Sequence, residues 1–200
     1  MQINDNKAII KADINHKLLM RRLFFILGLL LATNAIVAQT NYYTESKVFQ
    51  ENGYTYKVNY APFVELYNAE NKWIDQQPRY KDTGEIFEEE NIRIELSTGY
   101  TWDRAEALCD SIIRAEFSAI DMNRIKNNTD KITVVLYVNS ETGVVDEVSF
   151  SFYRESPYAY IPVSTYRRIE LAIKDKVRID VIEDESLLTF IYYWMKFDFK

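Results

Sequence analysis

The stretch KITVVLYVNSETGVVDEVSFSFY, residues 131–153, decides the fold of this chain. Residues 131–139 and 144–153 are both rich in β-branched and aromatic side chains, a composition that favours paired strands. The tripeptide Glu141-Thr142-Gly143 between them is short enough to close a hairpin, and its glycine tolerates a left-handed backbone. The sequence therefore predicts two adjacent antiparallel strands.

The segments after this hairpin predict a helix and a closing strand. Pro157 and Pro162 punctuate a loop, and residues 163–177 then carry apolar side chains at helical spacing. These are Val163, Tyr166, Ile169, Ile173 and Val177. Residues 186–199 have the pattern of a long strand. The order strand, turn, strand, helix, strand predicts one helix packed on one face of an antiparallel sheet.

Two further helices are expected before the hairpin. In residues 102–117, Ala105, Cys109 and Ile112 recur at helical spacing. Ser118 and Asp121 have the spacing of a capping box that opens a shorter helix, which ends near residue 126.

Residues 39–100 have the pattern of a β-meander. The expected strands are separated by turn signals such as Asn52-Gly53 and Asp82-Thr83-Gly84. They are Tyr43–Phe49, Tyr54–Tyr60, Val64–Tyr67, Lys72–Asp75 and Asn91–Leu96. The predicted class is therefore α+β, with a β-rich meander over residues 39–100 and a helix-on-sheet unit over residues 101–200.

An export signal is predicted at the N-terminus. Arg21-Arg22 precedes the apolar run LFFILGLLLA, residues 23–32, and small residues follow up to Ala38. We expect cleavage between Ala38 and Gln39, with Met20 as the true start and residues 1–19 as an over-extended reading frame. The run is short for a membrane span, although a buried helix or a single anchor is the alternative. No cysteine lies near the cut, so a secreted or periplasmic protein, not a lipoprotein, is expected.

Charge and composition exclude several functions. Without residues 1–38, 19 cations and 28 acids remain, a net charge of −9. Nucleic-acid binding needs a basic stripe, which is not visible. The one histidine, His16, lies in the leader, and Cys109 is the one cysteine. Histidine-dependent nucleophilic sites and the usual zinc sites are thereby excluded, and we expect no metal site, no cofactor and no enzymatic activity. Residues 180–185 are expected to be a solvated acidic loop rather than a calcium site.

The aromatic side chains near the C-terminus are the candidate ligand contacts. They are Tyr153, Tyr158, Tyr160, Tyr193 and Trp194. Neighbours in a strand face opposite sides, so one side of the last strand meets a helix and the other meets solvent or another layer. An exposed aromatic stripe binds sugar or peptide well. The alternative is that the meander or the helix at 102–117 covers this stripe.

Two family resemblances accompany these patterns. On the phrase VVLYVNSETGVVDEVSF, and on its order of elements, the region 101–199 resembles the TonB C-terminal domain superfamily. The resemblance implies the fold of that unit. It does not imply an energy-transducing function, because the Pro-rich spacer of energy-transducing members is missing. On VELYNAENK, YKDTGE and SPYAYIPVSTYRRIEL, the whole exported chain resembles a family of uncharacterised secreted proteins of gut Bacteroidota. That family is a domain of unknown function, so it implies no site residues.

The expected function is a non-enzymatic exported module that binds a protein or peptide, because an open sheet edge can accept a partner's strand. A glycan- or small-ligand-binding domain that uses exposed Tyr and Trp side chains is the alternative. A hydrolase with paired carboxylates is the third possibility. No stable membrane span is expected after cleavage.

Overall fold

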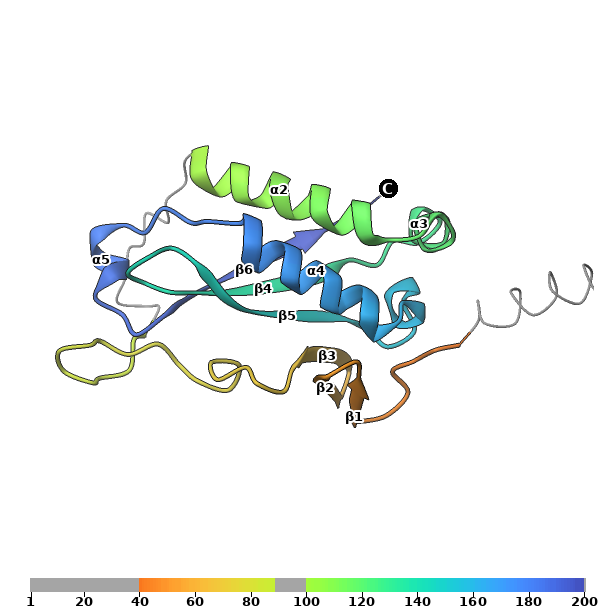
Figure 1. Ribbon diagram of the computed structural model, residues 1–200, viewed down its shortest axis with the longest axis horizontal. Coiled ribbons are helices and arrows are strands. Elements are labelled where there is room, and N and C mark those ends of the chain that lie inside the picture. Colours follow the sequence, from red (N-terminus) through yellow and green to blue (C-terminus); the bar gives the residue numbers. More distant parts are fainter. Residues whose placement is uncertain (1–39, 89–99, 200) are drawn as a thin grey trace, which may run out of the picture. The chain divides into compact units, whose positions relative to one another are not determined.

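Six strands form one antiparallel sheet in the order β1-β2-β3-β5-β4-β6 in the computed structural model, which describes residues 40–88 and 100–199 (Figure 1). The strands are β1 Lys47–Glu51, β2 Tyr54–Tyr60, β3 Phe63–Asn68, β4 Ile132–Val138, β5 Val145–Tyr153 and β6 Ile191–Phe197. The helices are α2 Tyr100–Glu116, α3 Ala119–Lys126, the 3-10 turn η3 Pro157–Tyr160, α4 Val163–Lys176 and α5 Glu183–Ser186. The predicted α+β class is confirmed.

The hairpin that decides the fold is present as predicted. Strands β4 and β5 pair antiparallel, with Leu136 opposite Val148, and Gly143 takes the left-handed conformation with φ of 66°. The Gly143 carbonyl accepts a hydrogen bond of 2.9 Å from the Ile179 amide, so the turn is also attached to the segment that follows α4.

The meander at residues 47–68 joins the same sheet through β3, which pairs with β5. Its first turn is the predicted one, since Asn52 and Gly53 both have positive φ, the geometry of a type I′ hairpin. Strand β1 begins at Lys47 and not at Tyr43, which is a correction. The Tyr43 side chain is fully buried and donates a 2.8 Å hydrogen bond to the Ile161 carbonyl.

The strand predicted at Lys72–Asp75 is wrong, because a carboxylate satisfies the backbone donors that a strand partner would take. The buried Glu147 accepts hydrogen bonds from the Lys72 amide at 2.6 Å and from the Trp73 amide at 3.0 Å. The Trp73 ring stacks on Phe190, 4.5 Å between centroids. This segment therefore lies against part of the sheet as irregular chain. The strand predicted at Asn91–Leu96 lies outside the described residues.

Helices α2, α3 and α4 lie on one side of the sheet (Figure 1). The predicted core positions of α2 and α4 are confirmed, since Cys109, Ile169 and Ile173 are almost completely buried. The Ser118–Asp121 capping box of α3 is present. Strand β6 is shorter than the predicted 186–199 strand, because residues 183–186 form the single turn α5.

The single cysteine has no exposed surface. Burial, and secondarily the Glu106 charge, raise the pKa of the Cys109 thiol to about 12. An ordinary thiol has a pKa of about 8.5 and becomes reactive as the thiolate forms. We therefore expect iodoacetamide to label the folded protein slowly at both pH 7 and pH 9.

The guanidinium-unfolded protein, which contains the same single cysteine, is the matched control. Its labelling rate should rise strongly between the two pH values. Equal labelling rates for the folded and unfolded protein at pH 9 would show that the thiol is accessible. The buried face of α2 would then be assigned wrongly.

Candidate functional site

Among the described residues, β1 and β6 are the two edge strands of the sheet. Strand β6 directs Tyr193 and Met195 toward the helices, whereas Trp194 and Lys196 face away from them and are exposed. No strand among the described residues pairs with the outer side of β6. The Trp194 side chain is 65% exposed, the largest fraction among the exposed large hydrophobic side chains of the described part of the chain.

The predicted aromatic candidates divide into surface and core residues. Tyr153 is 51% exposed, and its ring lies 4.6 Å from that of Phe63. Tyr160 is half-buried, with the Arg124 guanidinium 5.6 Å from its ring. Of the predicted set, Tyr153 and Trp194 therefore have the exposure that a surface ligand contact needs.

Tyr158 and Tyr193 are corrections to that set. Tyr158 is fully buried because η3 turns its ring toward Phe117 and Phe152. Tyr193 is buried because it shares the helix-facing side of β6, and its hydroxyl donates a 2.8 Å hydrogen bond to Glu185. Neither ring has the exposure that a surface ligand contact needs.

A groove of about 400 Å³ lies between α2 and the end of β6. Its lining residues are Asp103, Glu106, Ala107, Asp110, Lys196, Phe197 and Asp198. Phe197 is buried on the helix-facing side and Lys196 is exposed on the other, so the groove reaches both sides of β6 at its C-terminal end.

The groove carries excess negative charge. Its lining holds four carboxylates and one ammonium group, Lys196. Arg114 pairs with Asp110 at 2.7 Å, and the Lys131 ammonium lies 3.9 Å from Asp198. The Asp103 and Glu106 carboxylates line the same groove as Lys196, so the described lining carries net negative charge and attracts cations. Sequence analysis did not single out these acids, because α2 and the end of β6 are far apart in the chain.

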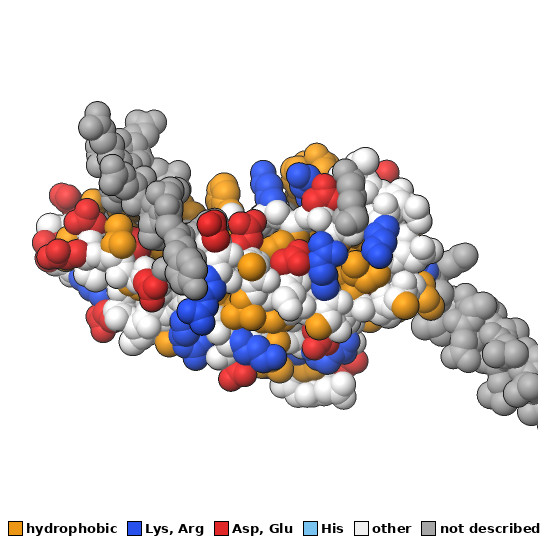
Figure 2. Space-filling view, turned by 90° about the horizontal axis from the view of Figure 1, so that it is seen from above, with side chains coloured by type: hydrophobic (Ala, Val, Ile, Leu, Met, Phe, Trp, Pro, Cys, Tyr) orange, Lys and Arg blue, Asp and Glu red, His pale blue; other side chains and the backbone are white. Residues whose placement is uncertain are grey.

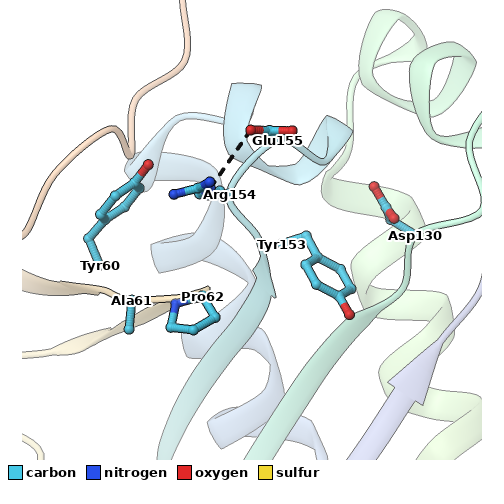
Figure 3. Close-up of a pocket in the computed structure, with 7 residues that line it drawn as sticks. All are labelled: Tyr60, Ala61, Pro62, Asp130, Tyr153, Arg154 and Glu155. Carbon is cyan, nitrogen blue, oxygen red and sulfur yellow. Dashed lines mark ion pairs between the residues drawn. The ribbon is translucent and has the colours of Figure 1, made fainter.

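A second cleft, of about 780 Å³, lies where β2 and β5 end and β4 begins (Figure 3). Seven residues line it: Tyr60, Ala61, Pro62, Asp130, Tyr153, Arg154 and Glu155. Tyr60 and Tyr153 stand on opposite sides of Arg154 in Figure 3. The Arg154 guanidinium lies 3.7 Å from Glu155 and 5.9 Å from the Tyr60 ring.

A buried polar cluster under α4 was missed by the sequence interpretation. Glu170 is fully buried, accepts hydrogen bonds from Tyr56 and from Arg167, and lies 3.9 Å from the Lys174 ammonium. Burial, and then the Glu170 charge, raise the pKa of the Tyr56 hydroxyl above its ordinary range. The signal was available, because Glu170 occupies a position next to Ile169 on the apolar stripe. Two cations neutralise the carboxylate, so the cluster fastens α4 to β2.

The acidic segment at residues 180–185 contains both exposed and buried carboxylates. Asp180, Glu183 and Asp184 are exposed, and acidic side chains gather at the α5 end in the view of Figure 2. Glu185 is instead buried and caps the start of α5 by accepting a 3.1 Å hydrogen bond from the Ile182 amide. In the described residues, no group of three or more His, Cys, Asp or Glu side chains is placed to hold a metal ion. Over the same ranges, no helix has the length and apolarity needed to cross a bilayer.

Comparison with known proteins identifies the relatives of this chain. Curated proteins give no match. A crystal structure of a DUF5043 family protein from Bacteroides uniformis is similar, with 30% sequence identity and a TM-score of 0.69, over 80% of this chain and 88% of that one. A family model, "Domain of unknown function (DUF5043)", matches residues 39–194. The chain therefore belongs to the DUF5043 family, as the sequence resemblance to uncharacterised Bacteroidota proteins predicted.

Proposed function

We propose that this protein is an exported, non-enzymatic module that binds an extended peptide along the outer edge of β6. The observation that carries the proposal is Trp194, a tryptophan 65% exposed on a seven-residue edge strand. Natural proteins protect their edge strands with charge, proline or a covering segment. An exposed tryptophan is none of these protective features. Tryptophan is instead enriched among the residues that dominate binding energy at interfaces.

The β6 edge offers both main-chain and side-chain contacts to a peptide. Alternate amides and carbonyls of an edge strand point outward and are able to form a ladder with an added strand. Trp194 lies beside Tyr192, 5.9 Å between ring centroids, and opposite Val135 on β4. These side chains form an apolar surface on which alternate side chains of an added strand would pack.

The charge of the groove selects a basic peptide. The Asp103 and Glu106 carboxylates of α2 line the groove at the C-terminal end of β6, together with Lys196. A peptide with Lys or Arg at alternate positions places these cations against α2, whereas an acidic peptide meets like charge.

The export and the absence of catalysis are parts of the same proposal. Export is supported by the basic and apolar leader, by the family match that begins at residue 39, and by Tyr43, which is already in the core. The order α2, β4, β5, α4, β6 supports a kinship in fold between the C-terminal half and TonB C-terminal domains.

A hydrolase has less support. Asp130 and Glu155 line one cleft, but the Glu155 side chain is 86% exposed and lies 3.7 Å from the Arg154 guanidinium. A general acid of the glycosidase type needs an apolar enclosure instead.

The peptide proposal predicts a large effect at one position. Residues 39–200 would be screened against immobilised ten-residue peptides with lysine at alternate positions and random residues between them. We expect a subset to bind, and Trp194→Ala to weaken that binding by about thirtyfold, since an interface tryptophan contributes about 2 kcal/mol or more. Raising the salt from about 0.1 M to about 1 M should weaken it further, because charges are then screened over about 3 Å instead of about 10 Å.

Val48→Ala is the matched control, because Val48 is 57% exposed on the opposite edge strand, β1. It should leave peptide binding unchanged. Capture of no peptide from the library, or an equal loss in both variants, would refute binding at the β6 edge.

A further inference from the structure

We propose that the cleft lined by Tyr60, Tyr153 and Asp130 binds a neutral oligosaccharide, at a site separate from the β6 edge. The cleft measures about 780 Å³, within the range of small-molecule sites, about 300–1,000 Å³. Tyr60 is the last residue of β2 and Tyr153 is the last residue of β5, so the sheet positions both rings, and the other lining residues lie in the segments next to the strands.

The two tyrosines supply flat apolar surfaces at separate places in the cleft (Figure 3). A sugar ring presents its C–H groups to such a surface, and the tyrosine hydroxyl adds a polar contact at the ring edge. Because Tyr60 and Tyr153 stand on opposite sides of Arg154, they suit two sugar units of one chain better than a single ring.

Both rings are held in place before any ligand arrives. Phe63 packs on Tyr153 at 4.6 Å, and the Arg154 guanidinium lies over Tyr60 at 5.9 Å. The Arg154 carbonyl accepts a 3.1 Å hydrogen bond from the Asn41 side chain, which fixes the backbone between the two rings. Preorganised contact surfaces lose less entropy on binding.

The polar groups of the cleft determine the charge of the ligand. Asp130 and Glu155 supply two carboxylates, and Arg154 supplies one guanidinium, which pairs with Glu155. The lining is thus slightly negative, so a uronic acid, a sulfated sugar or a phosphate would be repelled. Carboxylate oxygens accept hydrogen bonds from hydroxyl groups, and the guanidinium donates to them, so an uncharged, hydroxyl-rich ring satisfies all three groups.

Calorimetric titration with defined oligosaccharides tests this site. The probes are neutral tetra- to hexasaccharides of glucose, mannose, galactose and xylose, with an oligogalacturonate as the charged comparator. We expect at least one neutral probe to bind and the galacturonate to bind more weakly. Tyr153→Ala and Tyr60→Ala should each lower the affinity for the neutral probe by about tenfold or more, and Tyr153→Phe should retain most of it.

Trp194→Ala is the control that separates the two proposals. It should leave the sugar affinity unchanged even though it weakens peptide binding, so failure of either proposal is seen independently of the other. Thermal melts establish that each variant is folded, and Tyr60→Ala carries the test if Tyr153→Ala does not fold. Absence of binding by every neutral probe at millimolar concentration would overturn the proposal. Wild-type affinity in both Tyr153→Ala and Tyr60→Ala would overturn it as well.

Discussion

Ile169→Asp is expected to unfold the protein at room temperature. Ile169 is fully buried on the face of α4 that packs on the sheet. Removing a buried isoleucine side chain costs about 2–5 kcal/mol, and a buried, unpaired carboxylate adds several more. The sum is comparable with the whole stability of a domain, about 5–15 kcal/mol. Circular dichroism should show loss of the native signal.

Leu171→Asp is the matched control, because Leu171 is 48% exposed on the same helix. It introduces the same charge two residues away and should shift the melting temperature only slightly. Equal melting temperatures for the two variants would show that the buried face of α4 is assigned wrongly.

Gly143→Ala is expected to destabilise the hairpin that decides the fold. A Cβ at this position would lie 1.9 Å from the Ile179 carbonyl oxygen, which is backbone and has no rotamer to change. The left-handed φ of 66° costs a non-glycine residue roughly 1–2 kcal/mol. Displacement of residue 179 also breaks its 2.9 Å hydrogen bond to Gly143, worth about 1 kcal/mol. We expect a total of about 3 kcal/mol and a fall in melting temperature of about 10 °C.

Gly84→Ala isolates the conformational part of that effect. Gly84 has a similar φ of 72°, but no atom lies within 4 Å of a Cβ built there. The melting temperature of the Gly84→Ala variant should fall by about 4 °C, the effect of backbone strain alone. If both alanine variants melted together, the close approach of Gly143 to Ile179 would be contradicted.

The parts of the fold that the sequence predicts are those set by local patterns. The β4–β5 hairpin, the α3 capping box and the buried face of α4 follow from turn chemistry and periodicity within about 20 residues. The pairing of β3 with β5 joins residues more than 80 positions apart, and no local pattern specifies it. The irregular chain at residues 72–75 depends on Glu147, which is 75 positions from Lys72.

For the candidate sites too, local patterns were predictable from the sequence and long-range packing was not. The sequence indicated Tyr153 and Trp194 because an alternating strand must expose every second side chain. It did not separate them from Tyr158 and Tyr193, whose burial depends on which face the helices cover. Tyr60 and Asp130 come together only through the sheet order, so their shared cleft was not predictable.

Amide hydrogen exchange of β6 tests the peptide-binding account most directly. The measurement compares the free protein with the protein saturated by the tightest lysine-containing peptide from the library. Strand addition predicts that the outward-pointing amides between Trp194 and Phe197 become protected, while β1 amides keep their exchange rates. Unchanged exchange in β6 while the peptide is bound, or protection confined to β1, would contradict the account.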